Sequence, residues 1–217
     1  MINEKDKAKI LQGVSRDECA ELTKQLCDIP SPTGSEREIG DFILNWYSRH
    51  GIKSIRQEID PNRINAVGVI EGGGNGASVQ INGHMDTSFT GTEEDRMFCA
   101  ELDPVTELRG AVRDGKVFGL GASNMKSGVA AFMVAGKALK ESGVQLKGDC
   151  ILAAVAGEIS PTSASVSPGF NASETSRTGR MGPVAVSISM VRPSTCNKDP
   201  AGAGDPPGIT RASARSN

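Results

Sequence analysis

Apolar residues recur at intervals of three and four in three stretches of the chain, which is the spacing of an amphipathic helix. Such helices are predicted over residues 15–29, 35–51 and 125–142. The glycines Gly51 and Gly143 follow the last apolar position of the second and third stretch, where helices commonly end. The apolar stripe of the first stretch consists of Cys19, Leu22, Leu26 and Ile29.

Two capping boxes mark the beginnings of the first two helices. Ser15 with Glu18, and Ser35 with Glu38, have the spacing at which the serine accepts a backbone N–H bond and the glutamate reaches back. His50 stands beside Gly51 at a predicted helix end, where a histidine is usually a surface residue that offsets the helix dipole.

Short apolar and β-branched runs predict strands between these helices. Residues 64–71 and 77–83 are separated by a Gly-rich link, and a hairpin is the simplest connection between them. Residues 111–118 contain Asp-Gly, the pattern of a type I′ hairpin, and residues 150–155 read as a strand buried on both faces. Residues 88–110 have no clear period and are expected to form a loop. Alternation of strands and helices indicates an α/β layered domain.

Charge and hydropathy exclude several classes of protein. The chain has 217 residues, 24 Lys+Arg and 26 Asp+Glu, so nothing favours a nucleic-acid partner. The longest apolar runs fall far short of the roughly 20 residues needed to span a bilayer, and the charged start lacks the apolar part of a signal peptide. Five cysteines without C-x-x-C spacing indicate neither a disulfide framework nor a cysteine-based zinc site. We therefore expect a cytoplasmic protein without a membrane partner.

The composition changes abruptly near residue 160. In residues 160–217, Ser, Pro, Ala, Gly and Thr make up 36 of 58 positions, and the periodic signal disappears. Residues 184–191 are the one stretch there that suits a strand. We expect a domain over residues 1–159 and a low-complexity tail over residues 160–217 that is mostly irregular, either disordered or the product of a frameshift.

His84 and Asp86 are the first candidate site. His84 ends the predicted strand over residues 77–83, and in extended backbone Asp86 projects on the same side. A metal-binding imidazole commonly donates its second N–H to a carboxylate, so Asp86 is placed to orient His84. Taken alone, the pair is more simply read as a core histidine beside an aspartate that caps the next turn.

Asn124 and Glu158 are further candidates, each with a plainer reading. Asn124 lies in a Gly-rich helix entry at residues 119–128, which suits an anion but matches no nucleotide-binding pattern, and Asn124 alone is most simply a helix N-cap. Glu158 follows the strand at residues 150–155, at the edge where α/β sheets place their sites. It has the chemistry of a general base, and its plain reading is an exposed loop acid.

Taken together and in order, residues 29–36, 81–87, 119–128 and 154–158 resemble the M20 metallopeptidase family. That family holds acetylornithine deacetylase, succinyl-diaminopimelate desuccinylase, aminoacylase and carboxypeptidase G2-like enzymes. The resemblance implies a three-layer α/β/α zinc-hydrolase catalytic domain, of which this chain has the N-terminal half. It further implies hydrolysis of amide bonds in N-acyl amino acids or small peptides, and homodimerisation through a lid domain that this chain lacks.

The resemblance also implies roles for the candidate residues. His84 matches a zinc ligand, Asp86 the aspartate that orients it, and Glu158 the general base. Asn124 stands where the family has an aspartate that bridges two metals, and Ile159 stands where it has a glutamate ligand. Because no histidine follows His84, His84 and Asn124 are expected to hold at most one weakly bound Zn²⁺, or Co²⁺ in its place. A non-catalytic remnant or binding module that keeps the fold segment is the alternative.

Overall fold

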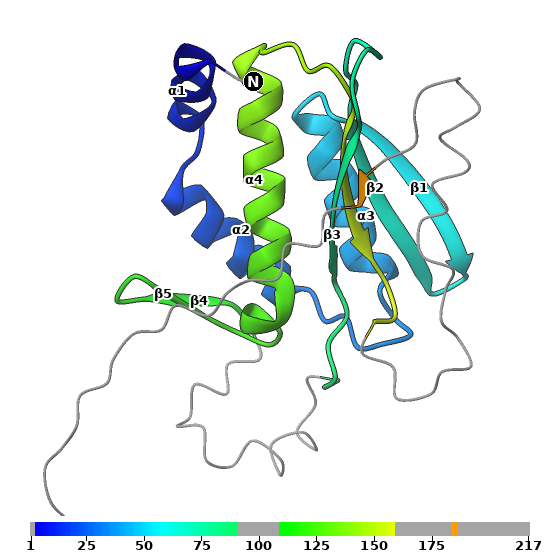
Figure 1. The fold of residues 1–217 in the computed structure, drawn as a ribbon. Coiled ribbons are helices and arrows are strands. Elements are labelled where there is room, and N and C mark those ends of the chain that lie inside the picture. The colour runs from blue at the N-terminus through cyan, green and yellow to red at the C-terminus, as the bar shows by residue number, and fades with distance from the viewer. Residues whose placement is uncertain (1–2, 91–108, 159–183, 186–217) are drawn as a thin grey trace, which may run out of the picture.

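A computed structural model of the chain describes residues 3–90, 109–158 and 184–185 (Figure 1). The segment Ala122–Lys126, which is non-helical at Asn124 and Met125, leads into the last helix. The helices are α1 (Glu4–Gln12), α2 (Arg16–Asp28), α3 (Arg37–Arg49) and α4 (Ser127–Ser142). The strands are β1 (Lys53–Asp60), β2 (Arg63–Ile70), β3 (Val79–His84), β4 (Ala111–Arg113), β5 (Lys116–Phe118), β6 (Cys150–Val155) and β7 (Val184–Ala185).

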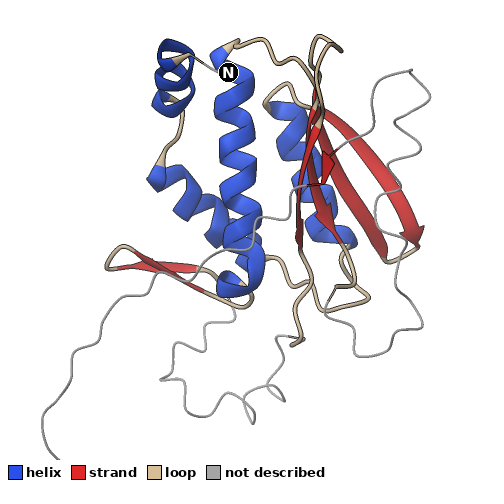
Figure 2. Ribbon diagram, viewed as in Figure 1, coloured by secondary structure: helices blue, strands red, loops and turns tan. Residues whose placement is uncertain are grey.

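The main sheet has the strand order β1-β2-β6-β3-β7 (Figure 2). β2 runs antiparallel to both β1 and β6, whereas β3 runs parallel to β6 and to β7. The predicted hairpin between residues 64–71 and 77–83 is therefore wrong, because β6 lies between the two strands. Ala154 pairs with Ala66 on one side and with Gly83 on the other.

The Gly-rich link at residues 72–76 runs beside the chain that enters β6. The backbone N–H of Gly73 donates to the carbonyl of Leu146 at 2.8 Å, and that of Asn75 donates to Lys147 at 3.0 Å. A Cβ at Gly72 would overlap the carbonyl of Gly148. The glycines thus allow close packing against a distant segment rather than a turn back onto β2.

The core lies between the sheet and its helices. α3 packs on β1 and β2, α4 packs on β3 and β6, and α1 and α2 pack against α4 (Figure 1). One apolar cluster joins these elements, with Leu26, Ile43, Ile64, Met133 and Leu152 among its buried members. A smaller cluster of Val67, Ile151 and Ala153 lies on the opposite face of the sheet. Within the described residues, helices cover one face, which accounts for two of the three expected layers.

The helix boundaries confirm the serine cap of the first capping box and correct the second box. The Ser15 hydroxyl accepts the N–H of Glu18 at 3.2 Å, and α2 begins at Arg16 as predicted. At the second box, α3 begins at Arg37, and Glu36 occupies the cap position without a side-chain cap bond. The Glu36 side chain is instead fully buried. α4 ends at Gly143 with φ +66°, the left-handed conformation that favours glycine.

The remaining predictions and omissions concern the short hairpin, the first helix, the edge strand and the tail. β4 and β5 form the predicted hairpin, with positive φ at Asp114 and Gly115. The polar sequences of α1 and β1 gave no periodic signal, and both elements were missed. β7 coincides with the start of the strand expected at residues 184–191, while the rest of the tail and most of the loop at residues 88–110 lie outside the described residues. No helix in the described part is long and apolar enough to cross a membrane.

Candidate functional site

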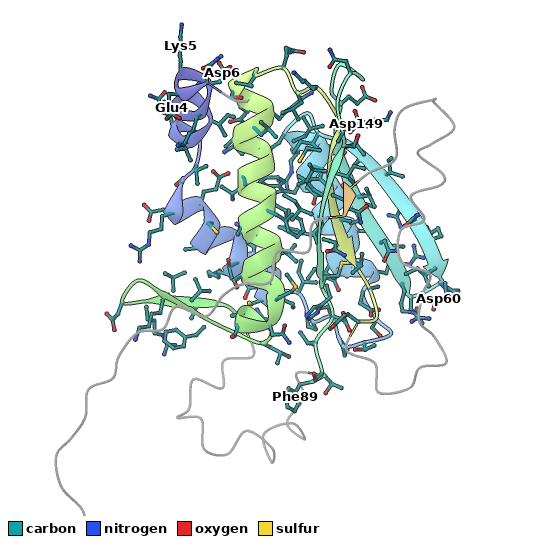
Figure 3. The ribbon with its side chains drawn as sticks, viewed as in Figure 1. Glu4, Lys5, Asp6, Asp60, Phe89 and Asp149 are labelled. Atoms are coloured by element: carbon teal, nitrogen blue, oxygen red, sulfur yellow. The ribbon has the colours of Figure 1, made fainter. Side chains whose placement is uncertain are left out.

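The candidate residues meet at the carboxyl ends of two neighbouring parallel strands. His84 is the last residue of β3 and pairs with Val155, the last residue of β6, so Glu158 follows closely. Figure 3 shows Asp149, just before β6, and Phe89, beyond β3, at opposite ends of the sheet. The site belongs to the end near Phe89, the edge at which α/β sheets bind ligands.

His84 is buried, and both of its ring nitrogens face oxygen atoms. Nδ1 lies 3.1 Å from the carbonyl oxygen of Asp86 and 3.4 Å from Oδ1 of the same residue. Nε2 lies 3.1 Å from Oδ1 of Asn124 and 3.6 Å from Oε2 of Glu158. A neutral imidazole has a single N–H to donate. With that proton on Nδ1, the Nε2 lone pair points at two further oxygens, an arrangement that suits a cation between them.

The same surroundings favour the charged imidazole when no metal is present. Burial lowers the pKa of His84, but hydrogen bonds to Asp86 and Asn124, together with the charges of Asp86 and Glu158, outweigh burial and raise the pKa. The oxygen atoms that would attract a metal cation therefore also favour protonation of His84.

Asp86 is fully buried, and its contacts include groups from three separate segments. Its Oδ2 accepts the hydroxyl of Thr33 at 2.8 Å, and its Oδ1 accepts the backbone N–H of Glu158 at 3.3 Å. The same Oδ1 faces His84. Asp86 therefore links the residue after β6 with the histidine that ends β3.

The segment 31–36, between α2 and α3, frames Asp86. The Ser31 hydroxyl donates to the carbonyl of Met85 at 2.7 Å, and the N–H of Thr87 donates to the carbonyl of Ser31 at 2.8 Å. The N–H of Thr33 donates to the carbonyl of Thr87 at 3.2 Å. No short-range pattern in the sequence assigns these residues a role, although they lie in a stretch that carries the family resemblance.

Glu36 is the last residue of this segment, and its carboxyl group is buried with only one of its two oxygens hydrogen-bonded among the described residues. Its Oε2 accepts the N–H of Gly34 at 3.0 Å, whereas its Oε1 has no hydrogen-bond partner among the described residues. Burial is the main cause that raises the pKa of Glu36, with a further rise from the charge of Asp86 and an opposing effect of Arg63. A second carboxyl group thus lies close behind Asp86.

The loop that carries Asn124 is tied to the end of α2 by a buried lysine. The Lys126 Nζ donates to the carbonyls of Leu26 at 2.9 Å and Ile29 at 2.8 Å. Burial lowers the pKa of Lys126 to about 8. Asn124 itself has φ −141° and ψ 98°, outside the helix, and Lys126 occupies the cap of α4. The N-cap reading of Asn124 is therefore wrong, because its side chain faces His84.

Glu158 and His50 differ in their distance from this cluster. Glu158 keeps 63% of its side chain exposed, yet its carboxylate reaches His84. His50 packs its ring 4.2 Å from that of Trp46 and lies 3.6 Å from Glu141, on the scaffold. His50 thus lies at the C-terminal cap of α3, the helix end at which the sequence places it, and is partly buried there.

The donor atoms fit part of a metal site. Two ligands about 2.0 Å from a tetrahedral zinc ion lie roughly 3.3 Å apart, close to the 3.1 Å between His84 Nε2 and Asn124 Oδ1. In residues 3–90 and 109–158, no group of three or more His, Cys, Asp or Glu side chains is arranged to hold a metal ion. His84 and Asn124 therefore offer two donors, and the remaining coordination positions need water or other groups.

Comparison with protein families supports the resemblance. Residues 80–167 match the model of Peptidase family M20/M25/M40. A probable succinyl-diaminopimelate desuccinylase of Staphylococcus epidermidis is 31% identical over 159 residues, 73% of this chain and 34% of that protein. The N-formyl-4-amino-5-aminomethyl-2-methylpyrimidine deformylase of Bacillus subtilis is 29% identical over 148 residues, 66% of this chain and 33% of that protein. The chain thus spans about a third of the length of these relatives.

Solved structures agree on the fold. Human carnosine dipeptidase 1 is 17% identical with a TM-score of 0.57, covering 75% of this chain and 36% of the other. The aminopeptidase PepT of Bacillus cereus is 18% identical with a TM-score of 0.52, covering 67% of this chain and 38% of the other. At these identities the likeness concerns the fold alone, and it confirms the predicted α/β class.

Proposed function

Since this chain is related to Peptidase family M20/M25/M40, we propose that it is the N-terminal part of a metal-dependent hydrolase of amide bonds in N-acyl amino acids or small peptides. The observation that supports this most is the meeting of an imidazole nitrogen, an amide oxygen and a carboxylate oxygen at the carboxyl ends of β3 and β6. The names of the two relatives, a desuccinylase and a deformylase, both describe removal of an acyl group.

In this proposal, His84 and Asn124 hold at most one Zn²⁺ weakly, or Co²⁺ in its place. When bound, such a metal lowers the pKa of a water molecule and polarises a carbonyl group. Asp86 orients His84 and keeps the imidazole proton on Nδ1, which leaves the Nε2 lone pair free for a ligand bond. The exposed carboxylate of Glu158 accepts a proton from the attacking water and returns it to the leaving nitrogen.

The rest of the proposal concerns the whole protein. A further part, with a lid domain through which two copies associate, would complete the site and shape the substrate pocket. We place the hydrolase in the cytoplasm, with residues 1–159 as half of its catalytic domain and residues 160–217 as a tail of low sequence complexity. A small N-acyl amino acid or peptide is the expected partner.

A non-catalytic binding module is the second candidate, and the neutral side chain of Asn124 favours it. An amide oxygen offers no charge to offset a dication, and the described residues supply only two firm donors. A chain of this kind would keep the fold and bind metal without turning over substrate.

Metal analysis combined with a hydrolysis assay tests the proposal. The purified chain is titrated with Zn²⁺ by calorimetry and assayed on N-acetyl and N-succinyl amino acids. Bound zinc with turnover that is lost in Glu158→Gln supports the hydrolase, and zinc binding must also disappear in His84→Ala. His50→Ala is the matched control, because it removes the scaffold histidine and should change neither. Zinc binding without turnover supports the binding module, and a chain that does neither overturns both.

A further inference from the structure

We propose that Thr33 is a positioning residue that fixes the carboxylate of Asp86 and, through it, the tautomer of His84. The inference rests on the proposed function, because it concerns how the candidate metal ligand is held. Thr33 lies between α2 and α3, far from β3 in sequence, and its hydroxyl reaches Asp86 Oδ2 at 2.8 Å.

The backbone around Thr33 holds this hydroxyl in place. Its own N–H donates to the carbonyl of Thr87 at 3.2 Å, and the N–H of Thr87 donates to the carbonyl of Ser31 at 2.8 Å. Pro32 and Thr87 form a parallel β-bridge. The backbone of Thr33 is therefore fixed directly to the segment that contains Asp86, which keeps its side chain within reach of that carboxylate.

The two oxygens of Asp86 consequently have different partners. Oδ2 accepts from Thr33, while Oδ1 lies 3.4 Å from His84 Nδ1 and accepts the N–H of Glu158 at 3.3 Å. Oδ1 and the carbonyl oxygen of Asp86, at 3.1 Å, are the two acceptors that face Nδ1. The terminal torsion of an aspartate is broad, so a carboxylate that loses one donor can rotate. The Thr33 hydroxyl opposes that rotation and keeps Oδ1 directed at the imidazole.

The consequence reaches the metal-facing nitrogen of His84. With its proton held on Nδ1, the imidazole presents the Nε2 lone pair toward Asn124 and Glu158. A proton on Nε2 would instead block the ligand position. Partners that orient a metal-binding histidine typically change metal affinity by about 10- to 100-fold when they are removed. Thr33 contacts Asp86 and not His84, so its effect on metal affinity passes through the Asp86 carboxylate.

Three variants separate positioning from plain structural support. Thr33→Val removes the hydroxyl at nearly constant shape, and Thr33→Ser keeps it. Thr23→Val is the matched control, since the hydroxyl of the buried Thr23 also donates, at 2.7 Å, but to the carbonyl of Cys19 within α2. Thermal unfolding of each variant records the structural effect.

Two readouts then report on the site. Calorimetric titration with Zn²⁺ gives metal affinity, and nitrogen NMR of the metal-free chain, at a pH where His84 is neutral, gives its tautomer. We expect Thr33→Val to weaken zinc binding about tenfold and to raise the Nε2–H fraction of the neutral imidazole, although the carbonyl oxygen of Asp86 still accepts from Nδ1. Thr33→Ser should restore both readouts, and Thr23→Val should lower thermal stability while leaving both unchanged.

A Thr33→Val chain with the tautomer of the unmodified protein overturns the inference, whatever its stability. If the unmodified chain binds no zinc, the proposed function fails, and the NMR tautomer alone decides the role of Thr33. If Thr23→Val shifts the tautomer as much as Thr33→Val does, the effect is general loosening of the fold and the inference is wrong.

Discussion

Oδ1 of Asn124 lies 3.1 Å from Nε2 of His84, so an uncharged amide oxygen is closer than the Glu158 carboxylate, at 3.6 Å, to the ring nitrogen that faces the candidate metal position. A carboxylate in the same place would add the negative charge that a dication attracts. We therefore expect Asn124→Asp to tighten Zn²⁺ binding by about tenfold or more, measured by calorimetry at pH 7.5.

Asn45→Asp is the control for this variant, because Asn45 is exposed on α3 and the substitution changes the net charge equally. It should leave zinc affinity unchanged. Equal affinities for Asn124→Asp and the unmodified chain would show that Asn124 does not face the metal.

The buried ammonium group of Lys126 makes stability depend on pH. Its folded pKa of about 8 lies below the ordinary value of 10.5, so the unfolded chain binds more protons between these two values. Stability from this group therefore rises with pH across that window. Lys126→Met removes this rise. It also leaves the carbonyls of Leu26 and Ile29 without the donor from Lys126, which should lower the free energy of unfolding by about 1–3 kcal/mol.

Urea unfolding at pH 7 and pH 9.5 checks this prediction. The stability advantage of the unmodified chain over Lys126→Met should grow at the higher pH. An advantage that is the same at both pH values would mean that Lys126 does not titrate differently in the folded state.

Glu36 should have the opposite pH dependence. Burial raises its folded pKa above the ordinary 4.5, so the folded chain retains a proton that the unfolded chain has lost, and stability falls as pH rises from about 4. Glu36→Gln cannot ionise, and its melting temperature should fall less between pH 4 and pH 7. The exposed Glu38 of α3 provides the control: Glu38→Gln should retain the slope of the unmodified chain.

Close packing at Gly148 tests the arrangement of the sheet. A Cβ at this position would overlap the backbone carbonyl of Ala77, which cannot move without disturbing the entry to β3. Gly148→Ala should lower the free energy of unfolding by about 1–3 kcal/mol. Gly73→Ala is the control, since its nearest neighbours lie 3.6 Å from the added carbon. Denaturant unfolding of both variants gives the comparison, and equal stabilities would contradict the close approach.

Local features of the sequence predicted local structure well. The box at Ser15, the Asp-Gly pair at residue 114 and the apolar run at residues 150–155 each act through neighbouring residues, and each formed the expected element. β1 was missed because edge strands are often charged, as Lys53 and Glu58 show, and this masks the alternating pattern. The hairpin was mispredicted because pairing with β6 depends on a strand far along the chain.

In the candidate site, too, the sequence indicates the local contacts but not the long-range ones. His84 and Asp86 share one strand end, so alternation alone indicated their proximity. That Asn124 reaches His84 depends on the loop that Lys126 ties to α2, and no short-range pattern reveals this contact. Thr33 acts through a hydrogen bond to a residue 53 positions away, which no spacing rule covers.

The position of β6 between β2 and β3 governs how this chain can fold during synthesis. β1 and β2 adjoin in sequence and can pair as soon as they leave the ribosome, whereas Val79 of β3 has Cys150 as its partner. His84 and Asp86 therefore emerge well before the strand that frames them. Since long-range parallel pairing is slow, the edges of β3 remain unpaired until β6 has been synthesised. We expect chaperones to bind the nascent chain at this stage.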